Sequence, residues 1–553
     1  MARSAHVDTF TRDNLPRAEL QPDFLFTLPE LQYPERLNAV TELLDSWVAK
    51  GHGDRPCIHA LVGSWSYGEL AERVNRIANV LVKDLGLVPG ARVLLRSANA
   101  PMLVAAYLAI LKAGGVVVAT MPLLRAKELA YPIAKAKIGL ALCDARLVAD
   151  LQAAQALAPD LRRIVTWGDG APGSLESLMA QASPDFEAVD TAAEDCCLIG
   201  FTSGTTGEPK GTMHNHRDLL AICDAYGRQV LKPTADDVFI GSPPLAFTFG
   251  LGGLVLFPLR VGASAVILEK AAPDDLLAAI ERFRATICFT APTAYRALLG
   301  KLTGRDISSL RRCVSAGETL PAATFEAWKT ATGVSMMDGI GATEMLHIFI
   351  GAPYEKVRAG STGTVVPGYE ARIVDDEGRE VPRGTPGRLA VRGPTGCRYL
   401  ADERQRNYVQ HGWNVTGDTF LQTEDGYFVY QARTDDMIIS AGYNIAGPEV
   451  EASLLAHPAV AECGVVGAPD PDRGMVVRAY VVLRDPAAAN PVMASELQEF
   501  VKADIAPYKY PRSIVFVDRL PRTETGKLQR FALRAQALAE GAPSEAAPMS
   551  LSA

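Results

Sequence analysis

The sequence lacks two features that would point to a stapled or membrane-embedded protein. Its nine cysteines are scattered without metal-ligand spacing, and two of them, Cys196 and Cys197, are adjacent, which fits neither a disulfide framework nor a zinc site. The most apolar stretch, residues 102–124, is interrupted by Lys112 and by two glycines. It therefore favours a buried helix followed by a buried strand over a membrane span. A reduced, cytoplasmic location is the simplest interpretation.

The sequence also has fewer positively than negatively charged residues. Lys and Arg number 55 against 63 Asp and Glu, which gives a net charge of -8. Because phosphate backbones require a basic face, we expect no nucleic-acid partner, although a local basic site for a small phosphate ligand is compatible with this balance. Residues 1–20 are polar and have no apolar signal-peptide core, and we expect no membrane partner.

The length and the order of patterns predict several domains. A chain of 553 residues is too long for one ordinary core. Between about residues 65 and 340, helical and strand patterns alternate, which predicts largely parallel sheets covered by helices. The predicted strands of this region are 92–96, 115–120, 139–143, 163–167, 196–201, 264–268, 286–290 and 312–316.

Two later regions have a different texture. Short strand-like segments and turns between about 360 and 430 predict an antiparallel, barrel-like subdomain, and a further unit of helices and strands follows it. We therefore predict an α/β fold with a large N-terminal domain and a small, mobile α+β C-terminal domain. The predicted limits are 1–433 for the large domain, 434–436 for a hinge, 437–535 for the small domain and 536–553 for a disordered tail.

A stretch rich in glycine and threonine, residues 202–211, directly follows a predicted buried strand. Glycines let the backbone curl so that its N–H groups face an anion, hydroxyls add donors, and Lys210 adds a cation for the outer phosphates. It is not a Walker A loop, and we expect the helix beginning near His216 to follow it. The residues expected to cradle phosphates are Thr202, Ser203, Gly204, Thr205, Thr206, Gly207 and Lys210.

Residues 202–211 resemble the signature loop of the adenylate-forming superfamily, which includes acyl- and aryl-CoA ligases, peptide-synthetase adenylation domains and luciferases. Further signatures follow in the expected order, so the resemblance covers roughly residues 30–535. It implies an ATP-dependent acid–thiol ligase that also uses Mg²⁺ and coenzyme A. Such an enzyme first forms an acyl-adenylate and pyrophosphate, and then transfers the acyl group to the coenzyme A thiol.

Three further segments are similar to the family's adenylate-binding motifs. Residues 338–344 resemble the second core motif, in which Thr343 would donate to the α-phosphate and Glu344 would hold Mg²⁺. Residues 315–318 resemble the adenine-lining segment, and 416–418 resemble the ribose motif, whose carboxylate can accept from two hydroxyls. The implied nucleotide contacts are Gly317, Glu318, Thr319, Asp338, Gly339, Ile340, Gly341, Thr343, Asp418 and Arg433.

Residues 521–527 resemble the last core motif of the family. Its Lys527 would contact the substrate carboxylate and stabilise the charge that builds in the transition state, completing a catalytic set with Lys210, Thr343 and Glu344. The resemblance also implies that the small domain rotates about Asp435 between the two steps. The loop that contains Gly442 and Tyr443 would then replace Lys527 and admit the pantetheine arm.

The acid-binding region looks most like that of benzoate-type aryl-CoA ligases. Flat aromatic acids suit a slot between an aromatic ring and glycine backbone. His347 has two interpretations: a buried histidine with its hydrogen bonds satisfied, or a partner for an ortho amino or hydroxyl group as in 2-aminobenzoate-type ligases. The expected pocket residues are Phe247, Thr248, Phe249, Ala316, Ile340 and His347.

Other functions remain open at this stage. A stand-alone adenylation enzyme could load an aryl acid onto a carrier protein, and a medium-chain acyl-CoA ligase would share the same motifs. A non-catalytic nucleotide-binding protein is disfavoured, because Lys210, Glu344, Asp418 and Lys527 are all intact. A homodimer is compatible with the sequence.

Overall fold

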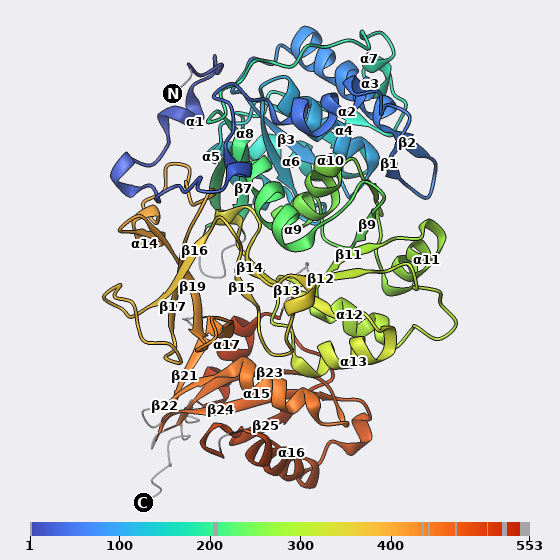
Figure 1. Cartoon of the computed structure of the whole chain (residues 1–553). Helices are drawn as coiled ribbons and strands as arrows, with labels where there is room; N and C mark the ends of the chain where they lie inside the picture. Colours follow the sequence, from blue (N-terminus) through green and yellow to red (C-terminus); the bar gives the residue numbers. More distant parts are fainter. Residues whose placement is uncertain are drawn as a thin grey trace, which may run out of the picture.

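The described strands of this protein form four sheets, and the second of them combines the first two strands of the chain with strands that follow the first sheet (Figure 1). The structure is a computed structural model that describes residues 3–202, 208–433, 436–440, 443–470, 473–505, 507–522 and 528–541. Within these ranges, the first two sheets and their helices form the large blue-to-yellow part of Figure 1. The last sheet forms the orange-to-red part below it.

The first sheet has the strand order β6-β5-β3-β4-β7-β8. Alternate residues of its strand β3 face opposite helical layers: Val93 and Leu95 pack into the core that contains α4, whereas Leu94 packs with α5 and α6. Burial of both faces explains why these strands are continuous apolar runs. Its strands are β3 (Arg92–Arg96), β4 (Val116–Thr120), β5 (Leu140–Asp144), β6 (Arg163–Trp167), β7 (Cys196–Thr202) and β8 (Lys210–Asn215).

The helices around this sheet agree with the predicted alternation of helices and strands. The apolar segment that begins at residue 102 forms α4, which is buried from Leu103 to Lys112, and it is followed by the buried strand β4. The helices are α3 (Tyr67–Asn79), α4 (Pro101–Lys112), α5 (Ala126–Lys135), α6 (Val148–Leu157), α7 (Leu175–Met179) and α8 (His216–Ile222), with short helices α1 (Phe10–Asp13) and α2 (Ser46–Ala49) before them.

The predicted helix near His216 is confirmed, because α8 begins at His216. The strand β8, which begins at Lys210 and lies between the phosphate loop and this helix, was not predicted. Strand β8 is antiparallel to β7, and Thr202 lies opposite Lys210. The strand β8 therefore separates the predicted phosphate loop from the amino end of α8.

The second sheet has the order β15-β14-β13-β12-β11-β9-β10-β1-β2, and its strands from β1 through β13 along this order run parallel. Parallel strands end at one edge of a sheet, so the segments after β12 and β13 meet there. The strands are β1 (Pro56–His59), β2 (Ser64–Ser66), β9 (Val238–Gly241), β10 (Ser264–Val266), β11 (Ile287–Thr290), β12 (Arg312–Ala316), β13 (Met336–Gly341), β14 (Ile348–Gly351) and β15 (Thr364–Val365). The helices of this part are α9 (Thr248–Leu251), α10 (Phe257–Val261), α11 (Pro273–Phe283), α12 (Pro292–Leu299) and α13 (Ala322–Thr332).

The third sheet is antiparallel throughout, as predicted for the barrel-like region. Together with the parallel sheets before it and the small sheet after it, this confirms the predicted α/β fold class. Its elements are β16 (Glu370–Val374), β17 (Gly387–Arg392), α14 (Gln405–Tyr408), β18 (Val409–Gln410), β19 (Trp413–Gln422) and β20 (Phe428–Arg433).

The fourth sheet belongs to the C-terminal region and has its own small core. Residues 434 and 435 of the predicted hinge lie outside the described ranges, so the domain limits stay predictions. The elements are β21 (Met437–Ser440), β22 (Tyr443–Ala446), α15 (Gly447–Ala456), β23 (Val460–Asp470), β24 (Gly474–Leu483), α16 (Pro491–Asp504), β25 (Ser513–Phe516) and α17 (Arg530–Gly541).

The predicted disordered tail begins too early. Helix α17 continues to Gly541, because Leu533 and Ala537, spaced at one helical turn, are both buried against the small core. Residues 536–541 are therefore helical, and residues 542–553 lie outside the described ranges. No helix in the described parts of the chain has the length and apolar character that crossing a membrane requires.

Candidate active site

The end of the predicted phosphate loop meets the second core motif. Lys210 opens β8, and its Nζ donates to the Tyr399 hydroxyl at 2.7 Å and lies 3.6 Å from Oε1 of Glu344. Thr202 closes β7 on the opposite side, with its hydroxyl 3.5 Å from the Lys210 carbonyl oxygen. The other predicted loop residues, 203–207, lie outside the described ranges. The structure thus brings together Lys210 and Glu344, two of the residues predicted to be catalytic.

Glu344 lies in a short turn of helix, η8 (Thr343–Met345), which follows β13. Its carboxylate accepts a hydrogen bond from the Tyr399 hydroxyl at 2.5 Å, and the residue is only 7% exposed. Burial, together with the Glu344 charge, raises the pKa of Tyr399 far above its usual range. The phenol therefore keeps its proton and remains a donor to Glu344.

A buried histidine, His214, holds the backbone of Thr343. Nε2 of His214 donates to the Thr343 carbonyl oxygen at 2.7 Å, which assigns the proton to that nitrogen. A Cβ atom on Gly200 would lie 2.9 Å from Cγ2 of Thr343, so glycine is required there for close packing. The two strands that flank the phosphate loop therefore also position the second motif.

The segment predicted to line adenine occupies the ends of β12 and β13. Gly317 has φ +88°, a left-handed conformation that favours glycine, and Glu318 accepts from the Thr293 backbone N–H at 3.4 Å. Thr319 follows in the same bend. Asp338 lies opposite Ser315 in the parallel register. These contacts place the predicted adenine segment beside the second motif.

Burial raises the pKa of Asp338 to about 8, although the Gly339 backbone and the Thr362 side chain oppose the shift. The carboxyl is largely protonated at neutral pH, so it can both donate and accept. Its Oδ1 is buried and has no hydrogen-bond partner among the described residues. Gly339 and Gly341 cannot carry side chains here, because a Cβ would lie 2.8 Å from Ile348 and 2.7 Å from the His347 carbonyl oxygen, respectively.

The predicted ribose residues also come together. Asp418 of β19 lies opposite Arg433 of β20, and Nη1 of the arginine is 3.9 Å from Oδ1 of the aspartate. After burial, the charges of Glu344 and Asp418 both help to raise the pKa of Tyr408. The ring of Tyr408 lies 5.8 Å from that of Tyr399, so these two tyrosines connect the ribose end of the site with its phosphate end.

The predicted acid pocket is lined by aromatic rings. Phe247 immediately precedes α9, Thr248 begins it, and the Phe249 ring lies 5.5 Å from Phe289 and 5.8 Å from His347. Ala316 and Ile340, from the ends of β12 and β13, belong to the same hydrophobic cluster as Phe249. Aromatic rings and small residues of this kind suit contact with a flat apolar ligand.

His347 is the polar group of this aromatic cluster. It is 2% exposed, and burial lowers its pKa to about 3, so the imidazole is neutral at physiological pH. Neither ring nitrogen has a partner at hydrogen-bonding geometry within the described residues, although the Phe249 backbone acts weakly to raise the pKa. This favours the second interpretation, a partner for a ring substituent, and both interpretations stay predictions. A Cβ on Gly252 would lie 2.3 Å from Cδ2 of His347, so that glycine makes room for the ring.

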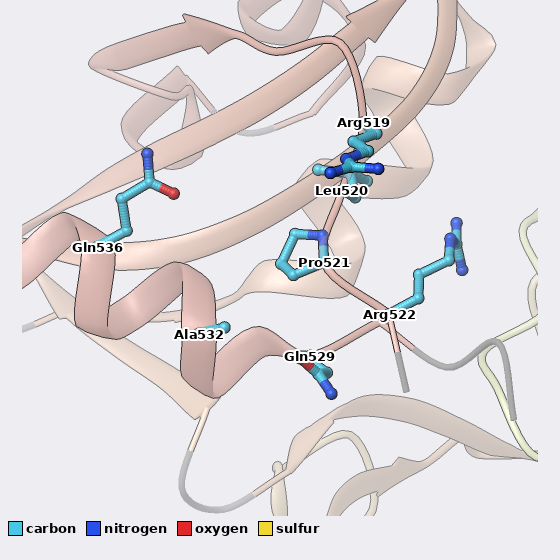
Figure 2. A pocket seen from close by; sticks show the side chains of 7 residues that line it. All are labelled: Arg519, Leu520, Pro521, Arg522, Gln529, Ala532 and Gln536. Atoms are coloured by element: carbon cyan, nitrogen blue, oxygen red, sulfur yellow. The ribbon is translucent and has the colours of Figure 1, made fainter. Parts of the chain in front are cut away.

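Lys527, predicted for the first step, lies outside the described ranges, as do Asp435 and Gly442, predicted for the domain rotation and the second step. Tyr443 opens β22 and lies opposite Ser440. Arg522 and Leu528, which flank residues 523–527, form an antiparallel bridge. Figure 2 shows the cleft of about 510 Å³ next to this bridge, lined by Arg519, Leu520, Pro521, Arg522, Gln529, Ala532 and Gln536.

Sequence reasoning missed several residues that complete the site. Tyr399 and Tyr408 lie beside Lys210, and His214 bonds to Thr343, but no motif marked these positions. Phe289, at the end of β11, was read only as part of a buried strand. The sequence could have indicated Tyr399 only through the position of its hydroxyl-bearing side chain within residues 397–400, a buried run in the region predicted as barrel-like.

A nucleotide site between a phosphate loop on one sheet and motifs on the edge of a second sheet is characteristic of adenylate-forming enzymes. The chain belongs to the AMP-binding enzyme family, and the model of this family matches residues 45–399. The AMP-binding enzyme C-terminal domain matches residues 449–527. The predicted membership of the adenylate-forming superfamily is confirmed.

Several relatives in this family are named as ligases of aromatic acids. The benzoate–CoA ligase of Thauera aromatica is 36% identical over 514 residues, which cover 92% of this chain and 98% of the relative. The anthranilate CoA ligase AuaEII in complex with anthranoyl-AMP superimposes with a TM-score of 0.88 at 35% identity, covering 92% of this chain and 99% of that one. A benzoate CoA ligase from Burkholderia xenovorans LB400 gives a TM-score of 0.82 at 34% identity, with coverages of 90% and 100%.

Proposed function

We propose that this protein is an ATP-dependent aryl acid–coenzyme A ligase that accepts benzoate or 2-aminobenzoate. It adenylates the acid with release of pyrophosphate, then transfers the acyl group to coenzyme A and releases AMP. The predicted enzyme class, an AMP-forming acid–thiol ligase, agrees with the family and with relatives that are themselves benzoate– and anthranilate–CoA ligases. ATP and coenzyme A are the cosubstrates of this chemistry.

The observation that carries the aryl assignment is the position of Phe249 and His347. Their rings lie 5.8 Å apart, and His347 follows the end of the second motif in the sequence. A planar acid ring seated beside Phe249 would present its carboxylate toward Thr343 and its ring substituent toward His347. A neutral imidazole with unsatisfied nitrogens can accept from or donate to an ortho amino or hydroxyl group.

In the first step, the residues of the site bind and orient the reactants. Lys210 supplies positive charge at the outer phosphates, and Asp418 with Arg433 would hold the ribose hydroxyls. Lys527 would bring a second cation to the substrate carboxylate and the α-phosphate. Positioning and charge neutralisation supply most of the rate enhancement when a carboxylate attacks a phosphate in line with its leaving group.

We also assign Glu344 as the protein ligand of Mg²⁺. The described residues contain no cluster of three or more acidic, histidine or cysteine side chains that could hold a metal alone. A single buried carboxylate beside Lys210 fits an ion that takes most of its other ligands from ATP phosphates and water. When bound, Mg²⁺ neutralises phosphate charge.

In the second step, the coenzyme A thiol must reach the acyl carbon after pyrophosphate has left. We assign this change to rotation of the C-terminal domain about Asp435, which would exchange Lys527 for the loop of Gly442 and Tyr443. Glycine at 442 would leave space for the narrow pantetheine arm. A change at a few hinge residues is sufficient for such a rotation.

The test is a pyrophosphate-release screen with purified full-length protein, ATP, Mg²⁺ and single acids. Benzoate, 2-aminobenzoate, hydroxybenzoates, halobenzoates, phenylacetate and hexanoate would be compared by kcat/KM. We expect benzoate or 2-aminobenzoate to rank first. A preference for hexanoate would refute the aryl pocket.

The acceptor is tested in the same preparation. Chromatography of the products with free coenzyme A should show an aryl-CoA thioester and AMP in equal amounts. Accumulation of enzyme-bound adenylate without thioester would instead indicate a carrier-protein acceptor.

A further inference from the structure

Tyr399 bridges two oppositely charged residues, Lys210 and Glu344. Its hydroxyl accepts from Nζ of Lys210 at 2.7 Å and donates to Oε1 of Glu344 at 2.5 Å, whereas the two charged atoms are 3.6 Å apart. The lysine ammonium also lies 4.7 Å from the centre of the Tyr399 ring. The phenol is 1% exposed, so these contacts are not diluted by water.

The backbone around Tyr399 is held on both sides by the strand that carries Lys210. The N–H of Met213 donates to the Arg398 carbonyl oxygen at 2.8 Å, and the N–H of Leu400 donates to the Gly211 carbonyl oxygen at 2.8 Å. The Tyr399 N–H donates to Oε1 of Gln405 at 2.8 Å. Tyr399 and Lys210 therefore belong to one hydrogen-bonded unit, which fixes the backbone of Tyr399 relative to the strand that carries the lysine.

A buried ion pair fixes the same unit in the core. Nη1 of Arg398, the residue before Tyr399, donates to Oδ2 of Asp218 at 2.8 Å, and both side chains are almost completely buried. The same carboxylate lies 3.6 Å from Nδ1 of His214, whose other nitrogen holds Thr343. Asp218 therefore contacts both Arg398, which precedes Tyr399, and His214, which bonds to Thr343 of the second motif.

The geometry and the charges together indicate what the Tyr399 hydroxyl does. Lys210 and Glu344 form an ion pair at 3.6 Å, longer than a direct hydrogen bond. Without the bridging hydroxyl the two groups could bond directly, and each would then be more fully neutralised before ATP arrives. A phenol that takes one hydrogen bond from the ammonium and gives one to the carboxylate leaves the remaining donors and acceptors of both groups for the nucleotide and its cation.

We propose that Tyr399 is a positioning residue of the nucleotide site, whose hydroxyl bridges Lys210 and Glu344 and holds both groups aimed at the triphosphate. The inference rests on the proposed adenylation chemistry. Tyr399 acts through Lys210 and Glu344, and it has no part in the acid pocket or in the thioester step.

The test is Tyr399→Phe in the full-length protein, which removes the hydroxyl and keeps the ring. A hydrogen bond to a charged group is worth enough to change affinity by roughly 10- to 100-fold. We therefore expect the ATP KM in ATP–pyrophosphate exchange to rise by that factor. Calorimetry with a non-hydrolysable ATP analogue, with and without Mg²⁺, should show a matching loss of affinity. The KM for the acid and the rate of thioester formation from preformed adenylate should stay within about twofold.

Two comparisons make the result decisive. Tyr67→Phe removes an equally buried hydroxyl, which donates to the Ala263 carbonyl oxygen at 2.7 Å, and should leave all four measurements unchanged. Tyr399→Phe introduced into Lys210→Ala should cost far less than in the wild type, because the partner is already gone.

An unchanged ATP KM and affinity in Tyr399→Phe would overturn the proposal. So would an equal loss for ATP, acid and the thioester step, or an equal penalty in the Lys210→Ala background, since these outcomes indicate general structural damage. Failure of the wild type to catalyse exchange with any acid would instead count against the proposed function, so the two failures are distinguishable.

Discussion

Nζ of Lys210 lies 3.6 Å from Oε1 of Glu344, although the two residues belong to different sheets. Lys210 opens β8 of the first sheet, and Glu344 follows β13 of the second. The nucleotide site is therefore built between the two sheets, and the acid pocket around Phe249 adjoins its second-sheet side. This arrangement separates residues that should control ATP from residues that should control the acid.

Lys527→Ala should separate the two half-reactions. Removal of a cation that stabilises developing charge should lower the rate of adenylation by about a hundredfold to a thousandfold. Thioester formation from preformed aryl-adenylate should be far less affected, because Lys527 is replaced at the site in that step. Stopped-flow measurements of both steps provide the check. An equal loss in both would refute the proposed domain rotation.

Phe249→Ala should change acid preference more than ATP affinity. The ring contacts Phe289 and His347 in the predicted acid pocket, so its loss should enlarge that pocket. We expect kcat/KM for benzoate to fall by about tenfold or more relative to larger or branched acids, with the ATP KM unchanged. Phe325→Ala, which truncates a ring of α13 in a separate cluster, is the control for general destabilisation. A pure change in ATP KM would contradict the pocket assignment.

His347→Phe should make the protein less sensitive to acid. Burial gives the folded state a pKa of about 3, whereas an unfolded histidine titrates near about 6.5. As the pH falls below that unfolded value, the unfolded state binds a proton that the folded state does not, so stability is lost. Between about pH 7 and pH 5 this histidine should cost about 2 kcal/mol of unfolding free energy.

Urea denaturation of wild type and His347→Phe at both pH values measures that difference. The variant should lose about 2 kcal/mol less than the wild type. His52→Phe, at an exposed histidine, should behave like the wild type. An identical pH dependence in wild type and His347→Phe would show that the imidazole is protonated in the folded state.

Arg398→Met should strongly destabilise the fold. Although burial opposes it, the Arg398 charge and the contact with His214 hold the pKa of Asp218 below its usual range. Removing one partner of a buried ion pair leaves the other charge uncompensated and costs about 3–5 kcal/mol. The urea midpoint should fall accordingly at neutral pH.

An exposed ion pair is the matched control for this loss. Arg406→Met breaks the surface pair with Glu403, and it should cost less than about 1 kcal/mol. A similar small loss for Arg398→Met would mean that Asp218 finds another partner.

Much of the fold could be predicted, because buried elements leave a clear hydrophobic pattern. The apolar run that forms β3 and the helical pattern that forms α4 are buried, and both elements lie within a few residues of their predicted limits. Strand β8 could not be found in this way, because Lys210–Asn215 is polar in sequence and owes its conformation to hydrogen bonds with β7.

The candidate site was predictable only in part. Motif order indicated Lys210, Glu344, Asp418 and Arg433, which the structure brings together in pairs, while the roles of these residues stay predictions. Tyr399 carries no motif, and its hydroxyl reaches Lys210 only because the segment between β17 and α14 pairs with β8.

The sequence alone determined the superfamily, the two-step chemistry and the type of fold, since these depend on which residues occur and in what order. Tertiary structure decided which groups are buried together: it placed Tyr399 between Lys210 and Glu344, and it left His347 neutral among aromatic rings. The physical reason is that hydrogen-bond partners and pKa values depend on distance and burial, which only the packing of distant segments sets.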